Sequence, residues 1–404
     1  MRSSALMLAV LLLVAVHPAQ AQTETVLYEF CSHSNCSDGS EPYSRLTSDG
    51  AGNFYGTTEI GGLGYGTVFE LSPNGSGGWN ETVLHTFTGF SDGAYPFFTT
   101  LIFDSRGNLY GTTSDGGQNN YGVVFELSPV GQEWVETVLF NFGADGGPYG
   151  TSPFNGVVMD AAGNLYGTFL VEGFTLNEAV YELSPSSTGW TLTTIYAYDS
   201  PADDQGGGGL TMDAKGNIFV DFSAAYRAPA IVELSPDGNG GWNPTVLHTF
   251  QKYYYPTGPP RLDKAGNLYG TTFGGGADDG GTVYELFPGK NGEWKLKILY
   301  HFRNDTTDGS GPFAGVVFDA AGNLYGTTTF GGPSNLGTVF ELARVGDYRY
   351  QEKVLWSFDG PDGNGPIGGL ILDGAGNLYG MTPSGGNPGC DANAGCGVVF
   401  EVTP

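Results

Sequence analysis

The chain has 404 residues, of which 68 are glycine and 14% are aromatic, and it carries 42 Asp and Glu against 15 Lys and Arg. Loss of residues 1–21 would remove one arginine, leaving 14 cations and a formal net charge of −28. A field of this sign repels phosphate groups, which argues against nucleic acid and an anionic membrane surface as partners. Short aromatic and β-branched strips between glycines argue against disorder and indicate many short strands.

The first 21 residues have the three parts of a secretory signal peptide. Arg2 supplies the positive charge, an apolar run extends from Ala5 to Val16, and the small residues Ala19 and Ala21 form a cleavage site. That run is too short to span a bilayer, and no later segment approaches twenty apolar residues, so no membrane span is expected. We expect cleavage near Ala21 and a secreted or periplasmic protein, a monomer with one domain over residues 22–404.

A phrase of the form G-N-L-Y-G-T-T occurs seven times, at intervals of 50 to 56 residues. In the second unit it follows TTLIFD (99–104) and precedes GVVFELSP (122–129) and WVETVLFNF (134–142). These segments are short and rich in β-branched and aromatic residues, as strands are. Each unit is therefore predicted to be a four-stranded antiparallel meander. Seven such units, which must bury their faces on one another, predict an all-β, seven-bladed β-propeller.

The two ends of the chain predict how the ring closes. TETVLYEF (23–30) is a copy of the fourth strand of the unit, and GVVFEVTP (397–404) is a copy of the third. The N-terminal strand should therefore complete the last blade. An open stack of units would need polar end caps and would gain nothing from this permutation. The chain ends at Pro404, directly after the last strand, so we expect a released or periplasmic protein and not a wall-anchored one.

Three sets of acidic residues recur with the repeat. The Asp of D-x-x-G-N is predicted to accept hydrogen bonds from the amides of a tight hairpin: Asp49, Asp104, Asp160, Asp213, Asp263, Asp319 and Asp373. The Glu of the third strand is predicted to make hydrogen bonds within or between blades: Glu70, Glu126, Glu182, Glu233, Glu285, Glu341 and Glu401. An Asp-Gly pair is predicted to form another turn, with a calcium or sugar-hydroxyl site as the alternative: Asp38, Asp92, Asp145, Asp308 and Asp362. Apart from that calcium alternative, no cofactor is expected.

The three phrases D-x-x-G-N-L-Y-G-T-T, G-x-V-F-E-L-S-P and W-x-E-T-V-L-x-x-F, in fixed order, resemble the GloVer tandem repeat of secreted bacterial proteins, named for Gloeobacter and Verrucomicrobia. The D-x-x-G-N-L-Y turn is also similar, more distantly, to that of NHL-type propellers. The resemblance covers essentially all of residues 22–404. It implies an exported bacterial propeller and does not imply a reaction.

Departures from the repeat indicate where a ligand could bind. Blade four replaces Y-G-T-T with residues 219–222, and the loops of blades four and five that follow are predicted to lie side by side on one face. Aromatic stacking and pairing of Arg with a carboxylate would suit an acidic sugar. The candidate ligand-binding residues are Asp221, Tyr226, Arg227, Lys252, Tyr253, Tyr254 and Tyr255. Simple decay of the repeat is the alternative.

Three functions stay open on the sequence. The first is non-catalytic binding of a polysaccharide or cell-envelope component. The second is a carbohydrate-active enzyme, either a uronate lyase that uses Tyr and Arg or a glycoside hydrolase that uses paired carboxylates. The third is a structural envelope protein. The sequence contains no nucleophile elbow, HExxH, phosphate loop or CxxC pair, so it leaves open whether the protein is an enzyme.

The four cysteines lie at opposite ends of the chain, but the ring model brings them together. Cys31 follows the N-terminal strand, and Cys396 precedes the C-terminal strand that should pair with it. We therefore predict disulfides Cys31–Cys396 and Cys36–Cys390 across the closure of the ring, in a compartment that favours oxidation. The competing arrangement is local, with Cys31 bonded to Cys36 and Cys390 to Cys396.

Overall fold

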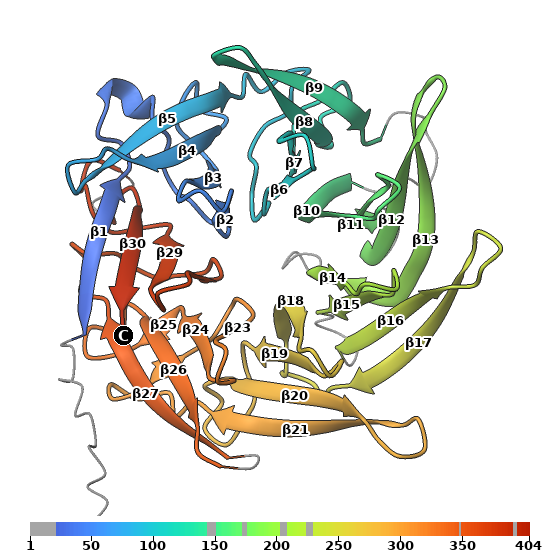
Figure 1. Cartoon of the computed structure of the whole chain (residues 1–404), viewed down its shortest axis with the longest axis vertical. Helices are drawn as coiled ribbons and strands as arrows, with labels where there is room; N and C mark the ends of the chain where they lie inside the picture. The colour runs from blue at the N-terminus through green and yellow to red at the C-terminus, as the bar shows by residue number, and fades with distance from the viewer. Residues whose placement is uncertain are drawn as a thin grey trace, which may run out of the picture.

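The computed structural model describes residues 22–143, 151–171, 176–202, 208–223, 229–346, 349–390 and 394–404, with only the backbone at 151, 171, 176–177 and 199–202. Seven four-stranded antiparallel sheets stand around a central axis, which confirms the predicted all-β propeller (Figure 1). Within these ranges, no helix has the length and apolar character needed to cross a membrane.

The strands follow the same order in every blade, from the central channel outward. The inner strands are β2 (Thr47–Ser48), β6 (Ile102–Phe103), β10 (Thr151–Met159), β14 (Leu210–Met212), β18 (Pro256–Leu262), β23 (Val317–Phe318) and β28 (Ile371–Leu372). The second strands are β3 (Phe54–Thr58), β7 (Leu109–Thr113), β11 (Leu165–Val171), β15 (Ile218–Phe222), β19 (Leu268–Thr272), β24 (Leu324–Thr328) and β29 (Leu378–Thr382). The third strands are β4 (Thr67–Pro73), β8 (Val123–Val130), β12 (Leu176–Ser186), β16 (Ala230–Pro236), β20 (Thr282–Pro288), β26 (Thr338–Arg344) and β30 (Val398–Thr403). The outer strands are β5 (Trp79–Thr86), β9 (Glu133–Asn141), β13 (Gly189–Ala202), β17 (Trp242–Thr249), β21 (Trp294–His301), β27 (Tyr350–Ser357) and β1 (Thr23–Glu29).

Two short elements lie outside this pattern. A two-stranded ladder joins β22 (Gly309–Ser310) to β25 (Phe330–Gly331) in blade six. A single 3₁₀ turn, η1 (Ser34–Cys36), follows β1. Neither changes the order of the blades.

The N-terminal strand closes the ring, as predicted. β1 pairs antiparallel with β30, from Thr23 opposite Thr403 to Glu29 opposite Val398, and the last sheet has the order β1-β30-β29-β28. Figure 1 shows the blue N-terminal strand beside the red C-terminal one. Blade seven therefore depends on both ends of the chain, and no blade is left with an unpaired third strand.

Aromatic contacts hold neighbouring blades together. In six of the seven junctions, a Phe at the end of one outer strand packs edge-on against an aromatic residue of the next blade's third strand, with ring centroids 5.1 to 5.5 Å apart. Such T-shaped pairs add to the free energy gained by burying the rings. The Gly of Y-G-T-T makes room for this ring: a Cβ on Gly56 would lie 2.7 Å from the Phe69 ring. The repeat therefore builds the same junction between successive blades.

The repeated acids act largely as predicted. The hairpin Asp accepts the amides two and four residues later, as Asp104 does from Arg106 and Asn108. The third-strand Glu accepts a hydroxyl within its own blade, as Glu285 does from Tyr269 at 3.0 Å. The Asp of the Asp-Gly pair accepts hydrogen bonds from a nearby backbone amide and from an aromatic side chain of the preceding outer strand. Asp308, for example, accepts from the Arg303 amide and from the Tyr300 hydroxyl. Asp145 lies outside the described residues. These contacts support the turn interpretation.

The prediction of disulfides across the ring closure is wrong. The structure bonds Cys31 to Cys36 and Cys390 to Cys396, which is the local alternative. The four cysteines do gather at the seam, where Cys36 Sγ lies 3.9 Å from Cys390 Sγ. In the first loop, the left-handed backbone at Cys31 and Cys36 folds the chain back on itself, which favours the local pair. The seam is therefore held by the β1–β30 ladder and packing, without a covalent link.

Candidate functional site

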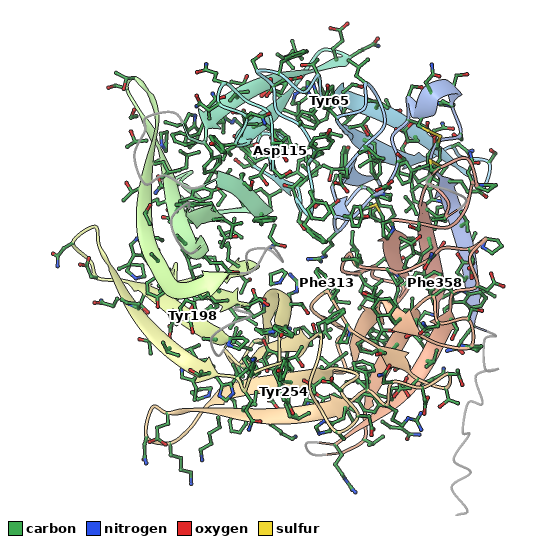
Figure 2. The ribbon with its side chains drawn as sticks, turned by 180° about the vertical axis from the view of Figure 1, so that it is seen from behind. Tyr65, Asp115, Tyr198, Tyr254, Phe313 and Phe358 are labelled. Carbon is green, nitrogen blue, oxygen red and sulfur yellow. A yellow bond between two sulfur atoms is a disulfide. The ribbon has the colours of Figure 1, made fainter. Side chains whose placement is uncertain are left out.

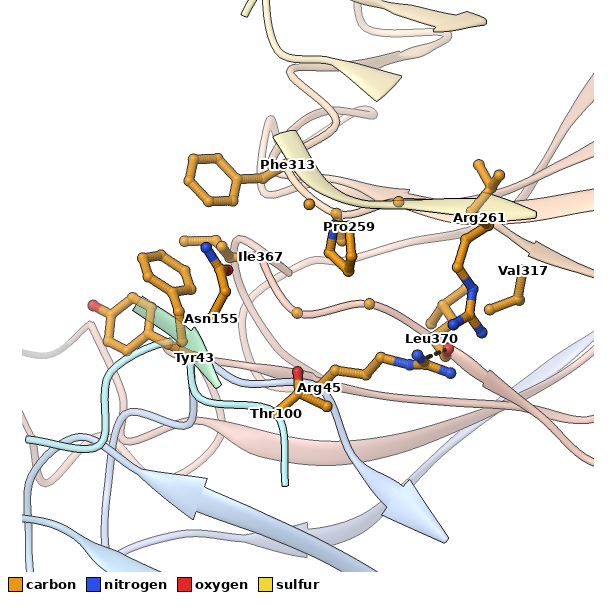
Figure 3. A pocket seen from close by; sticks show the side chains of 17 residues that line it. Tyr43, Arg45, Thr100, Asn155, Pro259, Arg261, Phe313, Val317, Ile367 and Leu370 are labelled. Atoms are coloured by element: carbon orange, nitrogen blue, oxygen red, sulfur yellow. Dashed lines mark hydrogen bonds between the residues drawn. The ribbon is translucent and has the colours of Figure 1, made fainter. Parts of the chain in front are cut away.

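The most distinctive cavity of the described structure lies in the central channel. It has a volume of about 60 Å³ and is lined by the inner segments of six blades. Blade one contributes Tyr43 and Arg45, and blade five contributes Pro259 and Arg261. Phe98 comes from blade two, and the remaining lining includes Asn155, Phe313, Val317 and Leu370. Figure 3 shows the aromatic residues and Asn155 toward one end of this cavity and the two arginines toward the other.

The two arginines stand where other blades carry small or apolar residues. Arg45 is the third residue after the proline that precedes the inner strand, where blades three, six and seven have glycine. Arg261 is the fifth residue after the equivalent proline, where blades three and six have valine. Because all inner strands converge on one axis, these departures from two distant blades place two cations in the same cavity.

The arginines share one end of the cavity, and none of its described lining residues is a carboxylate. The Arg45 Nε donates to the carbonyl of Leu370 at 3.1 Å, which leaves its terminal nitrogens for other acceptors. Within the described ranges, neither Arg45 nor Arg261 belongs to an ion pair. Burial, followed by the charge of Arg261, lowers the pKa of Arg45 to about 9, and burial lowers the pKa of Arg261. Two partly buried like charges are costly, and an anion between them would offset that cost.

Aromatic rings bridge the other end of the cavity. Phe98 of blade two stacks on Phe313 of blade six, with centroids 5.4 Å apart and ring planes 17° apart. Tyr43 packs edge-on against Phe98 at 5.8 Å. Phe98 and Asn155 both have left-handed backbone, with φ of 55° and 61°, a conformation that costs a non-glycine residue about 1–2 kcal/mol. We call Tyr43, Phe98 and Phe313 the aromatic collar.

The binding surface predicted on the loops of blades four and five is only partly described. Tyr226 and Arg227 lie outside the described residues. Tyr253 is 57% exposed, and the Lys252 Nζ lies 5.0 Å from the centroid of its ring. Tyr254 is partly buried and packs against the apolar cluster between blades four and five, and Figure 2 shows it away from Phe313, which lies beside the central opening. Of the three tyrosines, Tyr253 is the one most available to a ligand, and its binding role stays a prediction.

The surroundings of Tyr255 and Asp221 indicate that both residues have roles in the fold. The Tyr255 carbonyl accepts the amide of Phe273, which ties the loop to β19. Asp221 is completely buried on β15, and its carboxylate oxygens make no hydrogen bond of good geometry to the described residues. Burial raises its pKa well above the usual range, although the amides of Asp221 itself and Gly209 favour its charged form. Asp221 is therefore an interior carboxyl and not part of an exposed surface.

Sequence reasoning missed both channel arginines. The signal was present: in the segments that run from each inner-strand proline to the hairpin, and in the matching segment of blade four, Arg45 and Arg261 are the charged residues. The departures from the repeat in the exposed loops are longer and therefore easier to recognise in the sequence. In a propeller the inner strands are equally informative about a binding site, since their residues meet at the axis.

The fold and this cavity define a seven-bladed β-propeller with a cationic central channel. The chain matches the Gloeobacter/Verrucomicrobia repeat over residues 13–225 and 208–404, and it belongs to that family. No functionally curated protein matches it in sequence.

Several solved propellers are similar in fold at low identity. A putative glucose dehydrogenase of Thermus thermophilus is 15% identical, with a TM-score of 0.46 over 75% of this chain and 95% of that one. The soluble aldose sugar dehydrogenase of Escherichia coli is 12% identical, with a TM-score of 0.47 over 95% and 99%. An ulvan lyase is 11% identical, with a TM-score of 0.47 over 89% and 93%. Likeness at this level carries no argument about activity.

Proposed function

We propose that this protein is an exported, non-catalytic binding module for an acidic polysaccharide or another acidic component of the cell envelope. The observation that carries the proposal is the pair of channel arginines, Arg45 and Arg261, which have no carboxylate partner in the described structure. Export rests on the signal-peptide pattern of residues 1–21. Mass spectrometry of the protein recovered from its source should give a mature N-terminus near Gln22.

The chemistry of the channel suits a carboxylate or a sulfate. Guanidinium groups donate two parallel hydrogen bonds to such oxyanions, and these bonds are stronger than neutral ones. In water the gain would be small, but in a partly desolvated cavity the attraction is larger. The aromatic collar offers apolar ring faces on which a sugar can lie. A few converging polar groups within apolar walls are typical of ligand sites.

The lining favours binding over hydrolysis. The described residues around the cavity supply guanidinium, hydroxyl, amide and aromatic groups. Glycoside hydrolysis commonly uses two carboxyl groups about 5–10 Å apart, and the cavity is built from other residue types. A uronate lyase stays the alternative, with Tyr43 as the group to test, because its hydroxyl shares the cavity with the arginines.

Calorimetric titration of the mature protein with acidic and neutral saccharides tests the proposal. We expect acidic ligands to bind and their neutral analogues to bind at least tenfold more weakly, since one charge-assisted hydrogen-bond pair is worth about 1.5–3 kcal/mol. The double variant R45G/R261V uses residues that the repeat itself places at these positions, so it should fold and lose the preference. Lys290→Ala, which removes an exposed cation from an outer loop, is the matched control.

Two results would overturn this proposal. Undiminished binding by the double variant, combined with loss of binding in Tyr253→Ala, would move the site to the exposed loop of blade five. Release of an unsaturated uronide, detected by its ultraviolet absorbance, would show a lyase and not a binding module.

A further inference from the structure

We infer that the channel accepts one terminal oxyanion group, a carboxylate or a sulfate ester, so that the protein recognises the end of an acidic saccharide chain and not its interior. This inference rests on the proposed function and narrows the ligand to a chain end. Four features of the molecule support it: the size of the cavity, the rigidity of its wall, the position of the collar and the charge of the outer surface.

The cavity is too small for a sugar residue. Its volume is about 60 Å³. A cavity needs roughly 10–15 Å³ to hold one water, so this space is on the order of a few waters, or of one carboxylate or sulfate group. Pockets that enclose whole small-molecule ligands measure roughly 300–1,000 Å³. The charged group of the ligand can therefore enter while its ring stays outside.

Backbone contacts between blades fix the width of the channel. A Cβ on Gly258 would lie 2.6 Å from the amide nitrogen of Gly315, and one on Gly315 would lie 2.8 Å from the carbonyl oxygen of Pro259. These inner segments already touch. Thr271 strengthens the contact, because its hydroxyl donates to the Ala314 carbonyl of the next blade at 2.9 Å. Widening the channel would break such contacts, and close-packed interiors resist that change.

The collar blocks passage of a polymer. Phe98 and Phe313 come from blades two and six and stack on each other, so their rings bridge the channel. A chain that threaded through the ring would have to separate them. A terminal sugar can instead lie against the collar, with its charged group directed toward Arg45 and Arg261. The two guanidinium groups lie at the same end of the cavity, close enough for the charge of Arg261 to lower the pKa of Arg45, and do not form a row that could follow a chain.

The outer surface disfavours the interior of a polyanion. Residues 22–404 have a formal charge of −28. A polyuronate laid across a face of the propeller would bring many negative charges to that field, at a cost that low salt increases. A chain end that reaches the channel arginines meets positive charge with the fewest repulsive contacts. The repulsion from the acidic surface and the attraction to the channel arginines together favour the ends of acidic saccharide chains.

Matched oligosaccharides test the inference. The mature protein is titrated with glucuronate, with glucose 6-sulfate, with an acidic oligosaccharide that ends in uronate, and with the same oligosaccharide capped by neutral sugars at both ends. We expect the uncapped oligosaccharide to bind with one protein per accepted end, and the capped one to bind at least tenfold more weakly. Lengthening the chain should not change the number of proteins bound per chain. The two monosaccharides show whether carboxylate or sulfate supplies the oxyanion, and binding of either supports the site.

The outcomes separate the two proposals. Equal binding of capped and uncapped chains, or a number of bound proteins that grows with chain length, would overturn end recognition and leave acidic-glycan binding intact. Binding of none of the acidic saccharides would overturn the proposed function itself. R45G/R261V should lose binding of the monosaccharide as well as of the oligosaccharide, and Lys290→Ala should lose neither.

Discussion

Replacement of Glu81 by glutamine should stabilise the protein at alkaline pH and leave it unchanged in acid. Glu81 lies on β5, near Asp38 and Tyr28 at the junction of blades seven and one. Its Oε1 is buried and has no hydrogen-bond partner in the described structure. Burial, and then the charge of Asp38, raise the pKa of Glu81 to about 8. The pKa is raised to about 7 at the equivalent residues of three other outer strands: Glu24, Glu136 and Glu352.

The direction of the pH effect follows from proton binding. Below about pH 4.5, the ordinary pKa of the side chain, both folded and unfolded states hold the proton, and the stabilising contribution is fully present. Between that value and about 8, only the folded state holds it, so the free energy of unfolding falls as pH rises. A pKa raised from 4.5 to about 8 sets a ceiling of about 5 kcal/mol, at about 1.4 kcal/mol per pH unit. The side chain remains partly exposed, so solvent screening reduces this to about 1–2 kcal/mol.

Thermal and urea unfolding of wild type and Glu81→Gln across the pH range measure the effect. We expect melting temperatures that agree in acid and differ by roughly 1–3 °C in the alkaline range, where the variant is more stable. Glu133→Gln is the control, because Glu133 is exposed on β9 and its loss removes one charge without relieving burial. A Glu81→Gln advantage that is the same at every pH, or one shared by the control, would refute the reasoning.

Three further predictions concern the scaffold. Asp221→Thr should raise the free energy of unfolding at neutral pH by about 1–3 kcal/mol, because it replaces a buried carboxyl that has no hydrogen-bond partner among the described residues with the residue that blade five carries as Thr271; a lower melting temperature would contradict this. Deletion of residues 22–30 should lower the melting temperature and expose the edge of β30 to aggregation, and unchanged stability would argue against closure by β1. Peptide mapping without reduction should yield two independently closed loops, whereas a peptide that joins the chain termini would contradict the local disulfides.

The fold could be predicted because each of its determinants occurs in six or all seven of the repeat units. The D-x-x-G-N turn solves one local problem in every blade, and the glycine that accommodates Phe69 and the Phe at the end of the outer strand each do so in six of the seven. The closure could be predicted because TETVLYEF and GVVFEVTP copy known strands of the unit. One short segment alone is an ambiguous predictor of a strand, but the same pattern repeated along the chain is not. The period and the order of the segments are therefore enough to predict the architecture.

The disulfides and the site could not be predicted in the same way, because they depend on single loops and single residues. The ring model brought the four cysteines to one place but could not choose among pairs of sulfur atoms a few ångströms apart. In the first pair that choice depends on the backbone of a single loop, which is left-handed at Cys31 and Cys36. Asp221 was correctly singled out as a departure, but a strand sequence does not say that its side chain would be completely buried.

Position within the ring decides what a departure from the repeat can do. A cation on an outer strand, such as Lys295 of β21, lies at the rim of one blade. The equivalent residue of another blade lies far from it around the ring. An inner-strand cation is brought toward every other inner strand, so Arg45 and Arg261, more than two hundred residues apart in sequence, share one cavity. The pseudo-symmetry of the propeller therefore keeps substitutions on the outer strands far apart and brings substitutions on the inner strands together at the axis. Two substitutions at the axis can create an anion site that no single blade contains, while the blade junctions that stabilise the fold remain those of the repeat.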